Sequence, residues 1–252
     1  MTVKTAAAIA SLAAGLSLAG CSSFSEIGVD IPIQAKIDVS SFQRVLVAGF
    51  LTGGAKAIDA NTETARLLRS QLRSKQDMRV IDTDVLSLVD EVDRQKGQAP
   101  ATATDAESKI KTDKDLEAYE QIFSNAEYWK KVGAEYQSPL IVTGSVMFTE
   151  VSKSGVVSRP TSMPNEQGLE EYRSVRTYSD MKGYALAPKF VFIDGRTGAQ
   201  LFSETYHEEA LYPSTQNTPA LSSYFELMDK VLPSFLNTLS SQKIRGSRVL
   251  LK

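Results

Sequence analysis

The sequence predicts an α/β (α+β) fold, in which helices pack against a mixed β-sheet. Short apolar, β-branched runs that indicate buried strands alternate with segments whose apolar residues recur at helical spacing. Later in the chain two apolar runs flank Asp194-Gly195, and an Asp-Gly pair in this setting is a strong hairpin signal. Strand–helix–strand connections combined with a hairpin give a mixed sheet, which helices must cover to bury its apolar side chains.

The first half of the chain predicts two strands, each followed by a helix. The first helix places Ala65, Leu68 and Leu72 on its buried face and three arginines, Arg66, Arg69 and Arg73, on its solvent side. In order, we expect a strand at 44–50, a loop at 51–60, a helix capped by Asn61, a strand at 78–81 and a short helix from Asp84.

The second half supplies the centre of the sheet and the longest helix. Residues 139–148 are the most hydrophobic stretch after the amino-terminal region and are expected to form the central strand. Pro219 is expected at the first position of the last helix, and Pro233 is expected to kink or split that helix. The other expected elements are a helical segment from Asp115, strands at 184–193 and 199–206 around a turn at 194–198, and an edge strand at 248–251 that closes the sheet.

Two polar segments interrupt this pattern. Residues 96–113 and 153–182 are rich in polar and charged residues, contain prolines and lack an apolar period. They are expected to be exposed insertions with little burial. We therefore expect one domain at 42–252 that carries two polar insertions.

The first 21 residues resemble the export signal of a bacterial lipoprotein. Lys4 precedes an apolar run at 6–19, which is shorter than the roughly 20 residues that span a bilayer. The run ends in Leu18-Ala19-Gly20-Cys21, which is similar to a lipobox, and Cys21 is the only cysteine. The resemblance implies acylation of Cys21 (palmitate among the acyl groups) and cleavage after Gly20. Residues 1–20 are then a signal peptide and 21–41 a lipid-anchored tether; the alternative is an ordinary signal peptide with an accidental cysteine.

Location and charge narrow the set of partners. By analogy with characterised lipoproteins, an Asp after the acylated cysteine retains the protein in the inner membrane, and this chain has Ser22 there. We therefore expect an outer-membrane anchor with the domain facing the periplasm. The formal net charge of −2 provides no basic excess to neutralise phosphates, so nucleic acid is not an expected partner.

Three groups of residues resemble one superfamily. They are a strand ending in Ala48-Gly49-Phe50, the stretch from Val132-Gly133 to Leu140 through Val146, and a strand ending in Ile193-Asp194 with a turn through Thr197-Gly198. The pattern is similar to the curli secretion channel lipoprotein (CsgG-like), the penicillin-binding-protein activators (LpoB-like) and the amino-terminal domain of the Tol-system periplasmic protein. The resemblance implies a non-enzymatic role in binding proteins or in assembling rings. Gly144, Asp194 and Gly198 are expected to serve backbone geometry.

The sequence offers no set of residues for catalysis, metal or cofactor binding. His207 is the only histidine, which rules out a zinc site built on several histidines, and no Gly-x-Ser-x-Gly elbow accompanies it. Residues 49–56 approach a phosphate-binding loop, but Ala55 separates the last glycine from Lys56. We expect no enzyme, no metal and no cofactor.

Tyrosines concentrate in the last third of the chain and form a candidate protein-contact surface, because tyrosine is enriched at interfaces. The alternative is that half of them lie in the core or form cross-strand pairs. They are Tyr172, Tyr178, Tyr184, Tyr206 and Tyr212.

These expectations favour an outer-membrane lipoprotein that binds or scaffolds envelope proteins, without enzymatic activity, and that regulates or assembles envelope machinery. Envelope proteins, and further copies of the chain, are the expected partners. One alternative is a subunit of an oligomeric curli-type secretion channel, which would need apolar hairpins that neither polar segment offers. A second alternative is an envelope enzyme.

Overall fold

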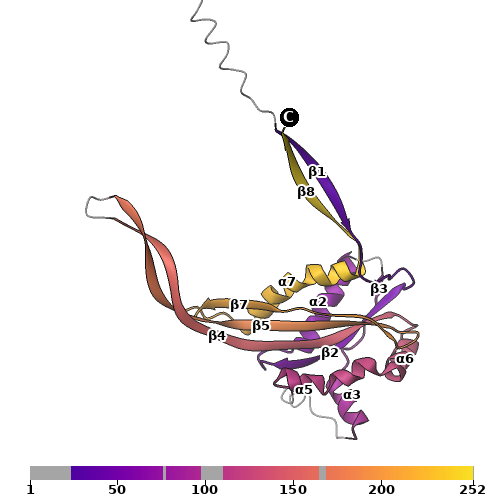
Figure 1. Ribbon diagram of the computed structural model, residues 1–252. Helices are drawn as coiled ribbons and strands as arrows, with labels where there is room; N and C mark the ends of the chain where they lie inside the picture. Colours follow the sequence, from indigo (N-terminus) through magenta and orange to yellow (C-terminus); the bar gives the residue numbers. More distant parts are fainter. Residues whose placement is uncertain (1–23, 76–77, 98–109, 165–168, 252) are drawn as a thin grey trace, which may run out of the picture. The chain divides into compact units, whose positions relative to one another are not determined.

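The computed structural model describes residues 24–75, 78–97, 110–164 and 169–251 (Figure 1). These residues fall into two compact units: residues 35–240 form one, and residues up to 34 together with those from 241 form the other. The elements in chain order are β1 (Phe24–Ile33), β2 (Arg44–Gly54), α2 (Ala60–Lys75), β3 (Arg79–Val80), α3 (Leu88–Gln95), α5 (Asp113–Glu117), η1 (Glu120–Ser124), α6 (Ala126–Glu135), β4 (Leu140–Pro164), β5 (Glu170–Asp194), β6 (Gln200–Thr205), β7 (Glu208–Pro213), α7 (Ala220–Leu239) and β8 (Gln242–Leu251).

The larger unit contains a mixed sheet in the order β3-β2-β4-β5-β6, with β7 also paired to β5. β2 runs parallel to both β3 and β4. β5 is antiparallel to β4 and, on its other edge, to β6 and β7 in turn. β4 is thus the central strand, and the predicted α+β class with a mixed sheet is confirmed.

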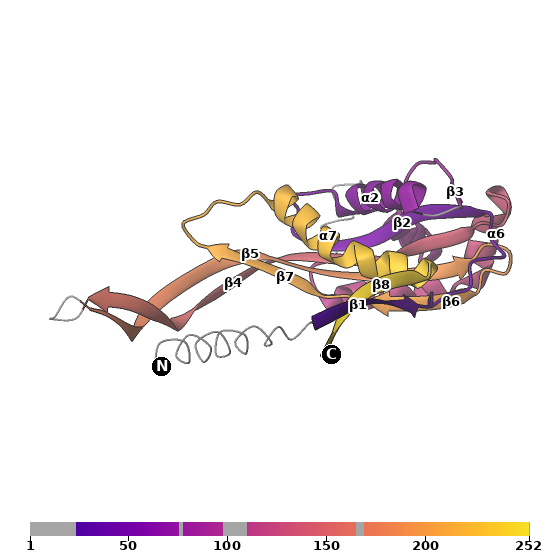
Figure 2. The ribbon, with the colours of Figure 1, turned by 90° about the horizontal axis from the view of Figure 1, so that it is seen from above.

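Helices cover both faces of this sheet. Residues of alternate parity along β4 and β5 enter different cores: Val142 and Phe190 lie with α2 and α7, whereas Ile141 and Val191 lie with α3, η1 and α6. The run at 140–148 is apolar almost throughout because both faces of the strand are buried. Figure 2 shows α2 and α7 together over one face of the sheet.

β2 contains a bulge near Gly49. The pairing with β4 shifts between Val47 and Phe50, so that one extra residue is accommodated near Gly49. A side chain at Gly49 would bring a Cβ to 2.3 Å from the carbonyl oxygen of Leu86, and Thr143 donates to the Gly49 carbonyl at 2.7 Å. Glycine is therefore required there by the close approach of the chain that follows β3.

Asn61 has a different role from the one predicted. It lies inside α2, where its Oδ1 accepts from the backbone N–H of Phe50 at 2.7 Å and its Nδ2 donates to Leu86. Asp59 caps the helix instead, by accepting from the N–H of Thr62. The predicted loop at 51–60 is also wrong in its first part, because β2 continues to Gly54.

Several helix predictions need correction. The helix expected from Asp84 begins at Leu88, and the segment after Asp115 is divided into α5, η1 and α6. Arg69, expected in solvent, is partly buried and donates to the carbonyls of Val47 and Thr83. The strand expected at 78–81 is reduced to β3.

α7 also differs from its prediction. Pro219 is the N-cap residue and not the first helical residue, and α7 runs through Pro233 as one helix. Phe235 and Leu239 are buried as predicted, whereas Leu221 at the start of the helix is 44% exposed.

The two polar segments have different outcomes. Most of 96–113 lies outside the described residues, but its end does not follow the expectation of little burial: Ile110 is fully buried and its carbonyl accepts from Gly54. At 153–164 and 170–182, β4 and β5 continue as regular strand, and most of these residues are exposed, as expected.

The smaller unit is a two-stranded antiparallel sheet. β1 pairs with β8 from Phe24 opposite Leu251 to Ile33 opposite Gln242. The prediction that residues 248–251 close the main sheet as an edge strand is therefore wrong, because their partner is β1. Residues 24–33 of the expected tether form β1 and are extended.

Candidate binding surface

β4 and β5 extend beyond the rest of the main sheet as a two-stranded arm (Figures 1 and 2). We call residues 154–164 and 170–180 the ribbon. Their pairing continues the register of the core without a shift, from Ser154 opposite Asp180 to Pro164 opposite Glu170. At the rise of a β-strand the ribbon is roughly 30 Å long. Its only strand partners among the described residues are its own two strands.

The ribbon exposes apolar side chains that a solvated hairpin does not need. Val156 and Tyr178 lie directly opposite each other, and each is 68% exposed. Tyr172, near the end of the ribbon, is 75% exposed, and Met163 and Leu169 are exposed nearby. Exposed apolar groups gathered on one projecting element are typical of a contact surface.

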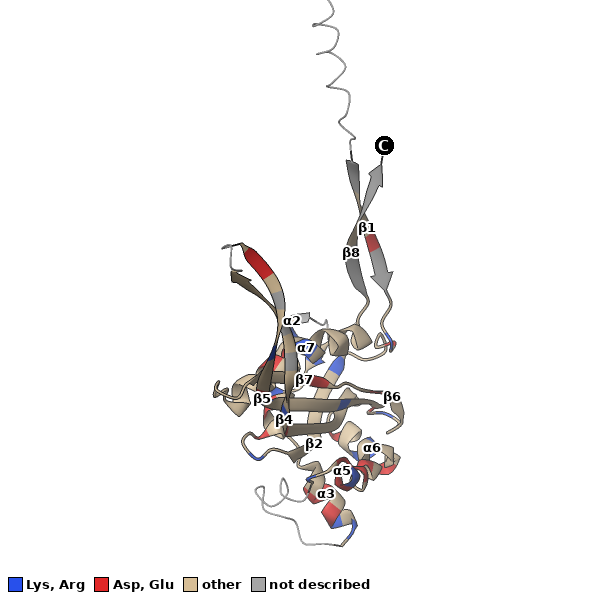
Figure 3. Cartoon of the chain, turned by 60° about the vertical axis from the view of Figure 1, so that its left-hand side comes forward, with Lys and Arg blue, Asp and Glu red and all other residues tan. Residues whose placement is uncertain are grey.

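Polar contacts hold the ribbon without burying it. Ser154 donates to Asp180 at 2.7 Å, and the hydroxyls of Ser158 and Ser174 lie 2.8 Å apart. The strand before it is fixed by Lys153, which donates to Glu209 at 2.6 Å. Acidic residues Glu170 and Glu171 begin β5 at the far end (Figure 3).

The five tyrosines predicted as one surface separate into three places. Tyr172 and Tyr178 lie on the ribbon, Tyr184 and Tyr212 at its base, and Tyr206 at the end of β6. Tyr184 stacks on Phe148 with 4.8 Å between ring centroids. Only Tyr172 and Tyr178 are largely exposed, so only the ribbon remains as the candidate contact surface. Its role in contacting a partner stays a prediction.

Two of the remaining tyrosines are bonded within the fold. Tyr206 donates to Glu204 at 2.7 Å, and burial together with this bond raises the pKa of Tyr206. Tyr212 donates to Glu226, and burial and this bond raise the pKa of Tyr212 as well. These phenols stay protonated and act as structural donors.

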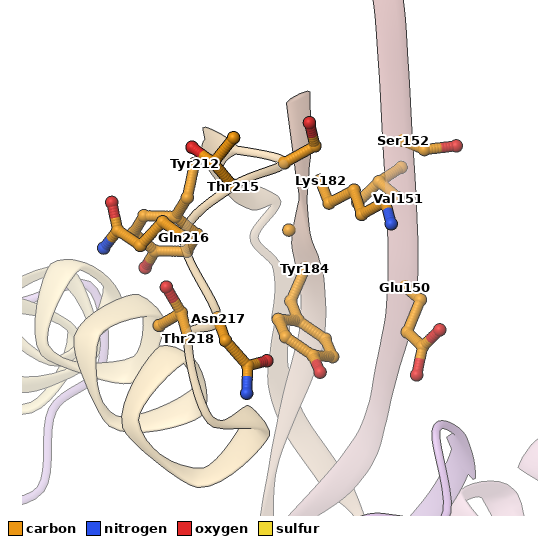
Figure 4. Close-up of a pocket in the computed structure, with 12 residues that line it drawn as sticks. Glu150, Val151, Ser152, Lys182, Tyr184, Tyr212, Thr215, Gln216, Asn217 and Thr218 are labelled. Atoms are coloured by element: carbon orange, nitrogen blue, oxygen red, sulfur yellow. The ribbon is translucent and has the colours of Figure 1, made fainter. Parts of the chain in front are cut away.

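A pocket of about 580 Å³ lies at the base of the ribbon. Figure 4 shows Lys182 and Tyr184 of β5 on one side and Tyr212, Asn217 and Thr218 from the end of β7 and the segment before α7 on the other. One cation, Lys182, one carboxylate, Glu150, and several neutral donors and acceptors line it. This composition suits a polar group of a partner better than an apolar one.

A second concavity of about 660 Å³ lies between α3 and α6. Three carboxylates, Glu91, Glu127 and Glu135, line it together with Tyr128 and Tyr136. Burial, with Glu91 nearby, raises the pKa of Tyr128 to about 12. The sequence interpretation missed this groove, because its lining is brought together only by the packing of two separate helices.

The residues examined for catalysis are not assembled into a site. His207 is exposed between β6 and β7, as expected for a strand end. The near match to a phosphate-binding loop lies largely within β2, so residues 49–54 belong to a strand of the sheet and do not form a cradle. Within the described ranges, no three His, Cys, Asp or Glu side chains are grouped to hold a metal ion. Cys21 lies outside the described residues.

No described helix has both the length and the apolar character needed to cross a membrane.

Asp194 and Gly198 form the predicted turn: Asp194 Oδ1 accepts from the N–H of Arg196, and the N–H of Gly198 donates to the carbonyl of Asp194. Gly144 is also explained by backbone geometry, since a Cβ there would lie 1.8 Å from the carbonyl oxygen of Lys189.

Comparisons with known proteins give structural likeness only. No protein-family model matches the sequence, and no curated protein matches it. Similar solved structures are the PelC dodecamer from Paraburkholderia phytofirmans (12% identity, 86% of this chain and 99% of that chain, TM-score 0.37), lipoprotein GNA1162 from Neisseria meningitidis (14%, 77% and 98%, 0.34) and the LpoB C-terminal domain from Escherichia coli (10%, 68% and 87%, 0.28).

The LpoB domain belongs to one of the groups that the sequence resembles. At these identities and TM-scores the likeness carries no argument about function, and the resemblance to the curli and Tol-system proteins stays a prediction.

Proposed function

We propose that the protein is a lipoprotein anchored in the outer membrane through Cys21, with its domain in the periplasm, and that it binds or scaffolds envelope proteins without catalysing a reaction. The observation that carries the binding role is the ribbon, which holds Val156, Tyr172 and Tyr178 away from the core with most of their surface exposed. An exposed aromatic ring keeps a large apolar area in water. When a partner covers the ring, it contributes a large contact area at a low cost in conformational entropy.

The anchor rests on Leu18-Ala19-Gly20-Cys21 after a short apolar run. Two acyl chains already bind a membrane stably, because each buried methylene contributes about 0.8 kcal/mol. An anchored domain works on partners in the same compartment. The ribbon supplies a surface that projects beyond the rest of the larger unit.

The anchor is tested by fractionation and intact mass. The wild-type chain is expected in the outer-membrane fraction, to be released by detergent, and to have the mass of an acylated chain that starts at Cys21. Cys21→Ala is expected to be soluble. A mature wild-type chain with a free Cys21 thiol contradicts the anchor.

The binding role is tested by photo-crosslinking in intact cells. A photoreactive phenylalanine replaces Tyr178, and the crosslinked products are identified by mass spectrometry. Capture of a defined envelope protein that decreases in a variant with Tyr172→Ala supports the proposal.

The matched control places the same group at Leu221, which is exposed on α7. Equal capture from both positions contradicts a role of the ribbon. A ring of identical subunits after detergent extraction supports the channel alternative instead.

A further inference from the structure

The two outer edges of the ribbon differ in their ability to accept another strand. In an antiparallel ladder the N–H and C=O of one residue point to the same side, and this side alternates along the strand. Pro160 lacks an N–H yet pairs in register with Ser174. Its nitrogen therefore faces outward, and the same holds for Pro164, which lies four residues further along β4. Proline at two outward positions blocks pairing along the edge of β4.

The register then fixes which groups of β5 face outward. Ser174 lies opposite Pro160. Ser174 and every second residue of β5 from it therefore point their backbone N–H and C=O groups away from β4. Two bonds confirm this parity: the N–H of Ser214 donates to the carbonyl of Asp180, and the N–H of Tyr206 donates to that of Pro188. No proline occupies the outward positions of β5 within the ribbon, which are Glu170, Tyr172, Ser174, Arg176 and Tyr178.

Within the ribbon half of β5 and the residues next to it, β7 pairs only with the part of the outer edge that is nearest the core. β7 pairs with β5 from Leu186 to Met181, and the bond from Ser214 to Asp180 is the last. Beyond it, no strand of the described residues pairs with this edge. The edge of β5 therefore presents a continuous row of backbone donors and acceptors, which an extended strand satisfies.

We propose that the occupant of this edge is the same edge of a second copy of the chain, so that two ribbons join into a four-stranded antiparallel sheet. A two-fold axis needs one self-complementary surface on both copies. An antiparallel pairing centred on Ser174 meets this requirement, because it places Tyr172 opposite Arg176 of the second copy and Glu170 opposite Tyr178 of the second copy.

The side chains in this register are complementary. The Arg176 guanidinium lies within reach of the Tyr172 ring for a cation–π contact, and the Glu170 carboxylate accepts from the Tyr178 hydroxyl. Each contact occurs twice by symmetry. The pairing joins the ribbons by their β5 edges, so it leaves the exposed side chain of Val156, which lies on β4, available to other partners.

Disulfide crosslinking of the full chain tests the pairing. Ser174→Cys places a thiol on the two-fold axis, where paired Cα atoms lie within disulfide range. Ser158→Cys is the matched control, because Ser158 is the hydrogen-bond partner of Ser174 and lies on the edge that contains the prolines. Under a mild oxidant, we expect about tenfold more covalent dimer from Ser174→Cys than from Ser158→Cys.

The chain without an added cysteine tests the anchor separately, because a disulfide-linked dimer of that chain requires a free Cys21 thiol. Similar yields from both variants, absence of dimer from both, or a disulfide from position 174 to a different protein overturns the proposal.

A second pair of variants needs no thiol. Ser174→Pro removes an N–H that faces outward from β5 and is not used in the pairing of β4 with β5. Ser158→Pro removes an outward N–H from β4, the edge that Pro160 and Pro164 already block. Sedimentation of the detergent-extracted protein is expected to show a concentration-dependent dimer for the wild type and Ser158→Pro, and a monomer for Ser174→Pro. Circular dichroism verifies that the variants fold. A wild type that is monomeric at every concentration overturns the proposal.

Discussion

β4 and β5 contain two halves that share one register but occupy opposite environments. From Leu140 to Phe148, β4 is buried on both faces between two helical layers. From Ser154 onward, the same strand is largely exposed. The pairing with β5 continues through both halves without a shift.

The difference shows that strand pairing and burial are separate sources of order. In the inner half, removal of apolar surface from water stabilises the strands, at roughly 25 cal/mol per Å². In the ribbon, stability comes from the ladder, from cross-strand pairs such as Val156–Tyr178 and from the inner half, which sets the register. An isolated two-stranded hairpin is marginal in water, so the ribbon depends on its attachment to the core.

The largest contrast is expected from removing an apolar side chain in each half. Ile141→Ala leaves a cavity in the core beside α3 and α6 and is expected to lower the free energy of unfolding by about 2–5 kcal/mol. Val156→Ala removes an exposed side chain and is expected to change it by less than about 0.5 kcal/mol. Denaturant unfolding measures both; equal losses would mean that burial does not distinguish the halves.

A pair of glycines in β4 gives the next contrast. Gly144 has φ +151°, and an added Cβ would lie 1.8 Å from the Lys189 carbonyl oxygen, whereas Gly155 has open space around it. Gly144→Ala is expected to cost about 1–3 kcal/mol through overpacking and backbone strain. Gly155→Ala is expected to be close to neutral in the same thermal unfolding experiment. A neutral Gly144→Ala would contradict the close approach of β4 and β5.

Amide hydrogen exchange separates the halves without a mutation. Amides of the ribbon ladder are expected to exchange through local opening, because few buried contacts oppose it, and amides at 140–148 only through global unfolding. The test compares exchange under native conditions with the stability measured by denaturant. The samples are dilute enough to be monomeric, because the proposed dimer would cover the β5 edge; ribbon amides of the monomer that are as protected as those of the core would contradict this contrast.

The smallest effect concerns Glu204 in β6, beside the inner half. Burial alone would raise the pKa of Glu204, but hydrogen bonds from Lys36 and Tyr206 outweigh burial and lower it below its ordinary value of 4.5. The carboxylate therefore contributes stability above that pH, and the contribution is lost as pH falls through the lowered pKa.

Glu204→Gln is expected to reduce stability at neutral pH by about 1 kcal/mol or less and to flatten the loss of stability as pH falls below the ordinary pKa of 4.5. Glu127→Gln, an exposed carboxylate on α6, provides the control. Identical acid profiles for the wild type and Glu204→Gln would exclude a contribution from this group.

The inner half was predictable from the sequence and the ribbon was not. A buried strand is apolar on both faces, so residues 139–148 stand out in any scan, and Asp194-Gly195 marks the following turn. The ribbon mixes Ser, Arg, Thr and Pro with single apolar residues, which gives no clear period. Its strand structure follows from the register set elsewhere in the chain, and local residues do not encode it.

Other failures have the same physical origin. Asn61 was predicted from its residue type as a cap, but its side chain bonds to Phe50 and Leu86, which tertiary packing brings close. Residues 248–251 have the composition of an edge strand, and their partner β1 lies more than 200 positions earlier in the chain. Tyrosines are concentrated in the last third of the sequence, but which of their side chains are exposed depends on packing against elements such as β7 and α7.

The uninterrupted ladder also constrains how the ribbon changes in length during evolution. A residue inserted in β4 alone would exchange the two faces of every residue beyond it, including those in the core if the slip travelled inward. Matched insertions in β4 and β5 at the same distance from the tip leave the core unchanged. The reach of the arm can therefore vary among homologous chains by paired steps, while the sheet from which it projects stays the same.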